Sequence, residues 1–189
     1  SKKLIANGKI TEDDLKNAQI EEFVIGAHFN FNFFYSAVHE ELELLGVDMR
    51  RQTTLDGYLR MPADIQLEAL KKREPNNIEV GHVACTVRES LLEDVFEQAE
   101  RFVATVKKEY APGIIGPFAL QGAIEERDGK EQFTTFDVSF RMPGSPGTRF
   151  TPYSHYLFWE GVSFGRRIAI EIKDAVKAGV MLTIGTDSH

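Results

Sequence analysis

The 189-residue chain has a single cysteine, Cys85, which excludes a scaffold built on disulfides within the chain. No apolar run approaches the roughly 18 residues that a membrane-spanning helix needs, and no signal-peptide core is present. Basic residues are not in excess, because 22 Lys and Arg stand against 29 Asp and Glu, for a net charge of −7. We therefore expect neither nucleic acid nor a membrane as a partner, since anionic surfaces require a basic face. These absences favour a cytoplasmic protein.

The chain also lacks internal repeats, low-complexity segments and linkers rich in glycine and serine. We therefore expect residues 1–189 to form a single domain. Its composition, 42% hydrophobic and 27% charged, is that of an ordinary globular protein and excludes a disordered chain.

Strict alternation of phenylalanine with polar residues over 28–33 predicts a strand buried on its phenylalanine face. Residues 42–47 are expected to pair with it as a hairpin, and residues 78–87 and 114–125 form further strands. A return strand follows the Asp128-Gly129 turn and ends at Arg141, with Phe136, Val138 and Phe140 facing inward. The pattern predicts a mostly antiparallel sheet.

Helical periodicity is clearest over residues 90–110, where apolar residues recur on one stripe until Pro112-Gly113 ends the helix. A capping box at Thr11 predicts a short helix near the start, Pro62 begins another, and a final helix spans 162–178 and ends at Gly179. Helices and hairpins interleave, so the predicted fold class is α+β, with the sheet covered by helices.

Two strands carry unusual polar faces. His28, Asn30 and Asn32 form one, and Asp137, Ser139 and Arg141 form the other. A carboxylate can hold a divalent metal and an arginine can bind phosphate oxygens, but an internal Asp–Arg ion pair explains the second face equally well. The chain contains no complete phosphate-loop or dinucleotide fingerprint. The residues alone predict a ligand-binding domain with a polar cleft.

Six stretches are similar to a known family. Residues 20–26 resemble the hinge of ATP-grasp enzymes, which holds adenine. Five more blocks, in order, resemble the C-terminal half of archaeal formate-dependent 5-formaminoimidazole-4-carboxamide ribonucleotide synthetases. The resemblance runs from Ile20 to Lys177 and rests on the blocks Phe33-Phe34-Tyr35-Ser36, Glu43-Leu44-Leu45-Gly46-Val47-Asp48, Arg88-Glu89-Ser90-Leu91-Leu92, Gly113-Ile114-Ile115-Gly116-Pro117-Phe118 and Gly165-Arg166-Arg167-Ile168-Ala169.

This resemblance implies the C-terminal subdomain of an ATP-grasp ligase of purine (IMP) biosynthesis. It implies ATP, formate and aminoimidazole carboxamide ribonucleotide as partners, magnesium or manganese as cofactor, a formyl phosphate intermediate, and a homo-oligomer. The family's N-terminal substrate domain and phosphate loop are expected to lie outside this chain, which alone is expected to be inactive.

Position by position, the resemblance also implies roles for individual residues. Arg141 would face the phosphates as the catalytic residue, and Gln121 and Asp137 would bind the metal. The other implied roles are contacts to ATP by Glu21, Glu22, Phe23, Val24 and Glu43, and contacts to the ribonucleotide by His82, Arg50 and Arg51.

Three departures from the family pattern suggest a divergent paralogue. Gln121 and Asp137 stand where the family has two glutamates, and His82 stands where an asparagine is expected. The alternative is a non-catalytic nucleotide-binding or oligomerisation domain.

Register offers a test of the predicted metal pair. With a two-residue turn at Asp128-Gly129 and regular strands, Gln121 would share a face with Phe136 rather than with Asp137. A three-residue loop or a β-bulge would bring Gln121 and Asp137 together, and we predict one of these two features.

Overall fold

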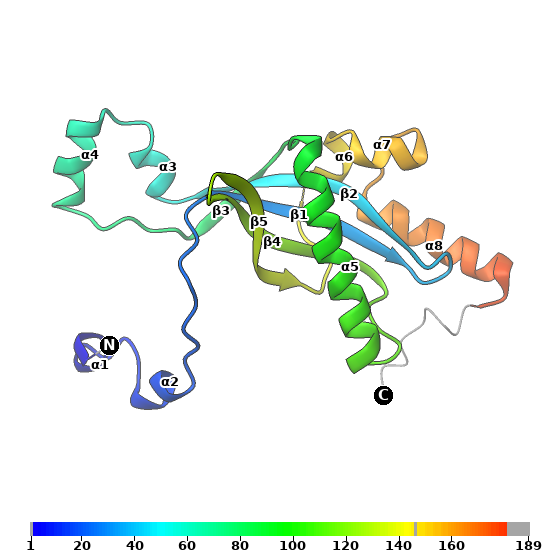
Figure 1. Ribbon diagram of the computed structural model, residues 1–189, viewed down its shortest axis with the longest axis horizontal. Helices are drawn as coiled ribbons and strands as arrows, with labels where there is room; N and C mark the ends of the chain where they lie inside the picture. Colours follow the sequence, from blue (N-terminus) through cyan, green and yellow to red (C-terminus); the bar gives the residue numbers. More distant parts are fainter. Residues whose placement is uncertain (1, 146, 181–189) are drawn as a thin grey trace.

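The computed structural model describes residues 2–145 and 147–180. Five strands form one antiparallel sheet in the order β3-β2-β1-β4-β5 (Figure 1). The predicted α+β class and the antiparallel sheet are confirmed. The strands are β1 (Ala27–Ser36), β2 (Glu41–Gln52), β3 (Glu79–Ala84), β4 (Gly116–Arg127) and β5 (Lys130–Ser139).

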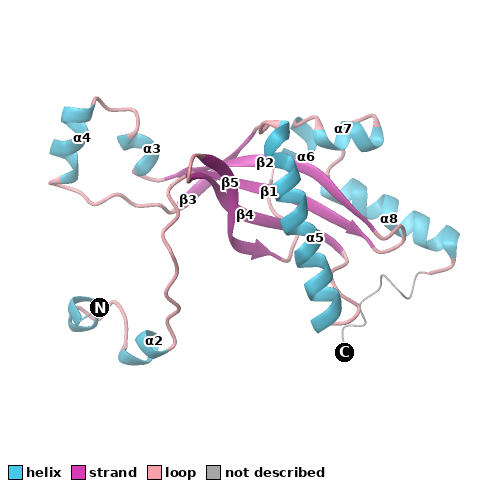
Figure 2. Ribbon diagram, viewed as in Figure 1, coloured by secondary structure: helices cyan, strands magenta, loops and turns pink. Residues whose placement is uncertain are grey.

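Two long helices lie on opposite faces of the sheet (Figure 2). Helix α5 (Leu92–Glu109), which follows the 3₁₀ turn η1 (Glu89–Leu91), packs against Phe33, whereas α8 (Phe164–Ala178) packs against Phe34. Consecutive strand residues point to opposite faces, so these two neighbours separate the two layers. Gly179 ends α8, as predicted, and Ser163 caps its start, within two residues of the predicted boundary at residue 162.

The main core lies between the sheet and α5, and the predicted apolar stripe of this helix is confirmed. Val95 and Ala99 are fully buried and pack with Phe31, Phe33 and Phe118. Burying one such phenylalanine side chain stabilises the fold by about 1.5–3 kcal/mol relative to leaving it in water. The alternating Phe face of β1 is thus what holds the sheet to α5.

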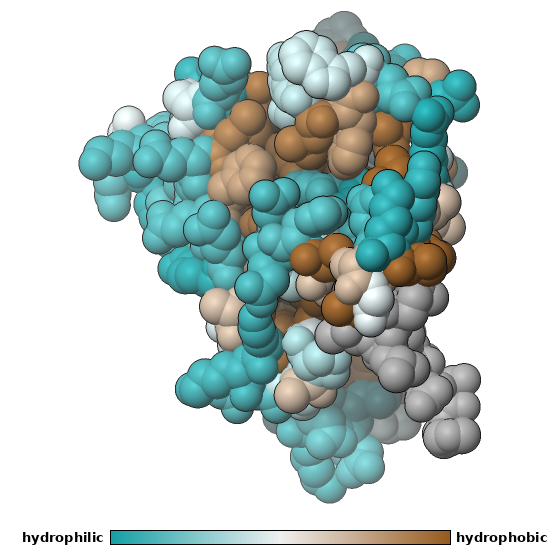
Figure 3. Space-filling model, turned by 90° about the vertical axis from the view of Figure 1, so that its right-hand side faces the viewer, coloured by the Kyte–Doolittle hydropathy of each residue, from teal (hydrophilic) through white to brown (hydrophobic). Residues whose placement is uncertain are grey.

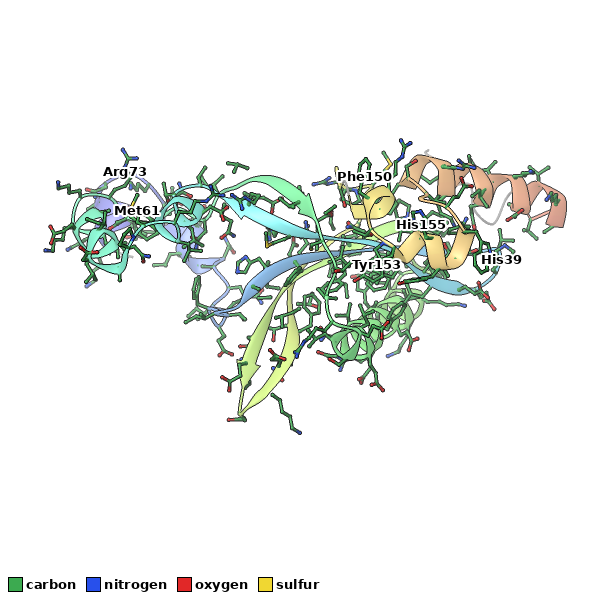
Figure 4. All side chains as sticks on the ribbon, turned by 90° about the horizontal axis from the view of Figure 1, so that it is seen from above. His39, Met61, Arg73, Phe150, Tyr153 and His155 are labelled. Atoms are coloured by element: carbon green, nitrogen blue, oxygen red, sulfur yellow. The ribbon has the colours of Figure 1, made fainter. Side chains whose placement is uncertain are left out.

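Two segments project away from the sheet (Figure 1). The first holds α1 (Lys2–Ala6) and α2 (Glu12–Lys16), the latter with the predicted capping box at Thr11. The second is an arm with α3 (Leu55–Tyr58) and α4 (Ala63–Leu70), on which Figure 4 labels Met61 and Arg73. Residues 19–25 form a mostly exposed connection between α2 and the sheet, and β1 begins at Ala27.

The β4–β5 hairpin combines a tight turn with a bulge. Asp128 and Gly129 both have positive φ, at 55° and 76°, which is the geometry of a two-residue type I′ turn. The register then shifts between Gln121 and Gly122, so that Gln121 pairs directly with Asp137. The predicted bulge is confirmed, and it places these two residues on one face.

After β5 the chain crosses back over the sheet toward β2. We call residues 140–145 the strap. Ser145 bonds to Asn32 of β1 and to Asp48 of β2, and the Gly147 amide donates to Asp48 Oδ1 at 2.7 Å. Gly46 of β2 lies so close to Gly147 that a Cβ on either residue would overlap backbone atoms of the facing segment. Helices α6 (Gly147–Phe150) and α7 (Tyr153–Phe158) follow along β2.

Within the described residues, no helix is both long and apolar enough to cross a membrane. The side of the molecule shown in Figure 3 carries hydrophobic surface set among hydrophilic side chains.

Candidate ligand-binding site on the polar face of the sheet

The face of the sheet opposite α5 carries a continuous set of polar side chains, which we call the polar face. One row crosses four strands, because the register pairs Asp48 with Asn30, Asn30 with Gln121, and Gln121 with Asp137. The two predicted polar strand faces are therefore brought together. The polar face consists of His28, Asn30, Asn32, Asp48, Arg50, His82, Gln121, Asp137 and Ser139.

Gln121 and Asp137 are suited to a hard cation. They present an amide oxygen and a carboxylate from adjacent strands. Gln121 is half-buried and Asp137 is exposed. Oxygen donors of this kind suit Mg²⁺, which commonly takes one or two carboxylates and completes its shell with phosphates and water. No group of three or more His, Cys, Asp or Glu gathers anywhere in the described residues, so a cation here would need anionic oxygens from a ligand.

The bulge turns Phe136 onto the polar face, which corrects the expectation that this ring faces inward. Its ring centroid lies 5.4 Å from that of His28 and 5.8 Å from the guanidinium carbon of Arg50. The bulge leaves Phe136 and Asp137 on the same side of the strand. A partly exposed aromatic ring thus borders the polar row. Phe140 follows the end of β5 and is 66% exposed, but its ring centroid lies 5.4 Å from that of Phe102 on α5, so it lies on the predicted side of the sheet.

His28 lies beside this ring, and its Nδ1 accepts a hydrogen bond from Gln52 Nε2 at 3.1 Å. Burial, and then the nearby Arg50 guanidinium, lower the pKa of His28 below its ordinary value of 6.5. His28 is therefore a neutral group near pH 7.

A chain of contacts connects Arg50, Glu79, His82 and Asn30. Arg50 Nε donates to Glu79 Oε2, and the other oxygen of Glu79 lies 2.6 Å from His82 Nε2. His82 Nδ1 lies 3.0 Å from Asn30 Nδ2. The structure thus places His82 and Arg50 on the polar face, as their predicted role requires.

Arg51 and Arg141 lie apart from this chain of contacts. Arg51 follows Arg50 on the strand and so points to the other face, where its Nε lies 3.4 Å from Asp56. Arg141 follows the end of β5 at Ser139 and is exposed. The predicted strand that ends at Arg141 is therefore two residues too long.

The predicted adenine segment lies beside β5. Glu21, Glu22 and Val24 line a shallow pocket of about 340 Å³ together with Phe136, and Arg127 binds Glu22 at 3.1 Å. Phe23 is not among the residues that line this pocket and is 75% exposed. Phe136 thus borders both the pocket and the polar row.

Glu43 has a different environment from the predicted one. Its carboxylate is buried and accepts two hydrogen bonds from Arg167, at 2.6 and 2.7 Å. Arg167 also contacts Glu171 at 3.0 Å, and its guanidinium lies 4.2 Å from the Phe34 ring centroid. Because α8 covers this end of the sheet, the Glu43 carboxylate is committed to holding the helix.

A more apolar cavity of about 620 Å³ lies between β2, the start of α5 and α7. Tyr153, labelled in Figure 4, lines it, and the Tyr153 hydroxyl accepts a hydrogen bond from the Val87 amide. Of the predicted site residues only Glu43 reaches this cavity, and it is paired with Arg167. The polar face has the richer donor and acceptor chemistry.

Sequence reasoning missed Glu79, Asp48 and Phe136. Glu79 stands three residues before His82, and no strand pattern indicates that two such residues will bond. Asp48 is fully buried and binds the strap through Ser145, a contact across 97 residues. The face of the sheet on which Phe136 lies depends on the exact position of the bulge, and the register alone did not predict that position.

Residues 1–186 match the model of a family described as a domain of unknown function, DUF1297. The chain belongs to the DUF1297 family.

Similar curated proteins include two archaeal ones named 5-formaminoimidazole-4-carboxamide-1-(beta)-D-ribofuranosyl 5'-monophosphate synthetase. The Methanopyrus kandleri protein is 40% identical over 96% of this DUF1297 chain and 49% of its own length. The Methanocaldococcus jannaschii protein is 40% identical over 90% of this chain and 46% of its own length. The chain thus spans about half the length of the curated relatives it matches. The resemblance predicted from the sequence is confirmed.

A solved structure shows the same fold. The IMP biosynthesis protein PurP from Thermococcus kodakaraensis is 34% identical, with a TM-score of 0.69 over 88% of this chain and 51% of that protein. The DUF1297 chain therefore has the fold of a comparable half of that protein.

Proposed function

We propose that this chain forms half of an ATP-dependent ligase that makes 5-formaminoimidazole-4-carboxamide ribonucleotide from aminoimidazole carboxamide ribonucleotide, formate and ATP. The observation that carries the proposal is the row of oxygen-bearing side chains across four strands, with Gln121 and Asp137 side by side. The names of the similar archaeal proteins support the reaction.

The reaction explains why no nucleophile–histidine pair is needed. A formate oxygen attacks the γ-phosphorus of ATP, so ADP leaves and formyl phosphate forms. The substrate amine then attacks the formyl carbon, the C–O bond to phosphate breaks, and phosphate leaves while the amine loses a proton. Both steps depend on alignment and on neutralising phosphate charge rather than on a covalent enzyme intermediate.

The polar face and the segments beside it have residues for these tasks. Gln121 and Asp137 would hold magnesium or manganese, which neutralises phosphate charge when bound. Arg141 would contact the phosphates, and Arg50 and His82 the ribonucleotide. The segment Glu21 to Val24, with Phe136 beside it, would hold adenine. Glu43 is left out of this set, because Arg167 occupies its carboxylate.

The remaining half of such a protein would supply the opposite wall of the site. We therefore propose that residues 1–189 act as one domain of a longer ligase and that this chain alone has no activity. A homo-oligomer in the cytoplasm stays a prediction.

The test is ADP release by the full-length protein with ATP and magnesium, with formate and the ribonucleotide omitted in turn. The proposal expects ADP release that depends on formate, and formylated ribonucleotide only when formate and the ribonucleotide are both present. Binding of ATP without any formate-dependent ADP would contradict it. That result would favour the alternative, a nucleotide-binding domain without catalysis, which the neutral amide of Gln121 suggests because it removes one negative charge from the cation site.

A further inference from the structure

Asn30 has a hydrogen-bond acceptor that nothing in the described residues uses. The residue is 3% exposed, and its Oδ1 is buried without a partner. Buried polar atoms in folded proteins are nearly always paired, because an unpaired acceptor loses its bonds to water and gains nothing in return. An exception at the centre of a polar row therefore calls for a ligand.

The contacts of His82 match the orientation of the Asn30 amide. Glu79 Oε1 lies 2.6 Å from His82 Nε2, a contact that favours the ring proton on this nitrogen. His82 Nδ1 then accepts from Asn30 Nδ2, which lies 3.0 Å away. The Asn30 oxygen lies on the other edge of the amide and has no partner among the described residues.

The location of Asn30 matches a ligand site. It stands between Asp48 and Gln121 in the row that ends at Asp137. Gln121 and His82 on the same face are only half-buried, so this face opens to solvent around Asn30. Asn32 also has an unpaired Oδ1, but it lies under the strap, with its Nδ2 bound to Asp48 and Ser145.

We propose that Asn30 Oδ1 accepts a hydrogen bond from an N–H group of the imidazole substrate, either its 5-amino or its 4-carboxamide group. Glu79 and His82 keep this oxygen turned toward the substrate, so His82 has a positioning role in addition to its own proposed contact with the ribonucleotide. The inference rests on the proposed function, which supplies a substrate with both kinds of donor. A neutral acceptor suits an amine that must keep its lone pair free for attack on the formyl carbon.

The test is isothermal titration of the full-length protein with the ribonucleotide and two analogues. One analogue has hydrogen in place of the 5-amino group, and the other has a carboxylate in place of the carboxamide. Asn30→Ala is expected to weaken ribonucleotide binding about 10- to 100-fold, since a buried acceptor is lost. The loss should disappear for the analogue that lacks the contacted N–H, while magnesium-ATP binding stays unchanged. Asn77→Ala, an exposed amide in a loop, is the matched control and should bind as wild type.

A second pair of variants changes the half-buried His82 and leaves the buried Asn30 of β1 in place. His82→Ala is expected to weaken binding roughly 3- to 10-fold by freeing the amide to turn. His82→Asn is expected to restore binding, because its amide oxygen can accept from Asn30 Nδ2.

Three results would overturn the inference. If Asn30→Ala weakened binding of the substrate and of both analogues equally, Asn30 would not accept a hydrogen bond from either N–H group. A loss of magnesium affinity instead would make Oδ1 a cation ligand, and unchanged binding in His82→Ala would remove the positioning role. Failure of the proposed function looks different: ribonucleotide binding with the expected analogue pattern, but no formate-dependent ADP.

Discussion

Two ends of one sheet face carry buried polar groups that differ in how they are paired. At the α8 end, Arg167 is 1% exposed and contacts both Glu43 and Glu171. Glu171 also accepts from the Ser36 hydroxyl and the Val38 amide. At the other end, Asn30 keeps an unpaired oxygen and Asp137 is exposed. At the α8 end both buried carboxylates are paired with the Arg167 guanidinium, although its Nη1 makes an ion contact to Glu171 and no hydrogen bond. Charge pairing beneath a helix indicates a structural role, whereas an unpaired acceptor on an open face indicates a place for a ligand.

The largest expected effect is on stability at the α8 end. Arg167→Ala would leave the carboxylates of Glu43 and Glu171 buried without their cation. Removing one partner of a buried ion pair costs about 3–5 kcal/mol. The free energy of unfolding, measured by urea denaturation, should fall by that amount.

The neighbouring Arg166 is a matched control, because it is exposed and pairs only with Glu160. Arg166→Ala should change the free energy of unfolding by less than about 1 kcal/mol, as expected for a surface ion pair. Equal losses in the two variants would contradict a structural role for the Arg167 cluster.

The next effect concerns the start of α6, which follows the strap. Gly46→Ala would place a Cβ against the Gly147 backbone, and overpacking of this kind costs about 1–3 kcal/mol. Gly81→Ala on β3 meets nothing within 4 Å and serves as the control. Thermal unfolding should distinguish the two variants, and a Gly46→Ala protein as stable as Gly81→Ala would show that Gly147 is not held against β2.

A smaller effect is expected from His28 at the open end. Its pKa is lowered in the folded protein, so the unfolded chain binds protons more readily as the pH falls below about 6.5. The stability it contributes is complete above the unfolded-state pKa and is lost as pH falls through the folded-state pKa. Wild type should therefore lose more stability than His28→Gln between about pH 7 and pH 5. Parallel pH profiles of the two proteins would contradict this.

Local patterns predicted much of the fold. The alternation in β1 and the apolar stripe of α5 depend only on spacing along the chain, and both are confirmed. Given the metal pair that the family resemblance implied, the register of the β4–β5 hairpin predicted either a three-residue loop or a bulge. The structure has the bulge, which pairs Gln121 with Asp137.

What failed depends on contacts between distant segments. Glu43 and Arg167 are 124 residues apart, so no local pattern indicates that the helix occupies this carboxylate. Phe136 is the extra residue of the bulge, next to Asp137, and it therefore faces the polar row. Where β5 ends is likewise set by the strap, which leaves the sheet after Ser139 to reach Asp48.

The most direct test of the account compares Asp137→Asn with Asp174→Asn in the full-length protein. Both changes remove one carboxylate, but Asp174 lies on α8, and among the described residues its ion pairs are surface contacts to His39 and Lys177. Formate-dependent ADP release should fall at least about 100-fold in Asp137→Asn, at an unchanged unfolding midpoint, and stay at the wild-type rate in Asp174→Asn. Wild-type ADP release by Asp137→Asn would contradict the claim that the open end of the sheet is a wall of the active site.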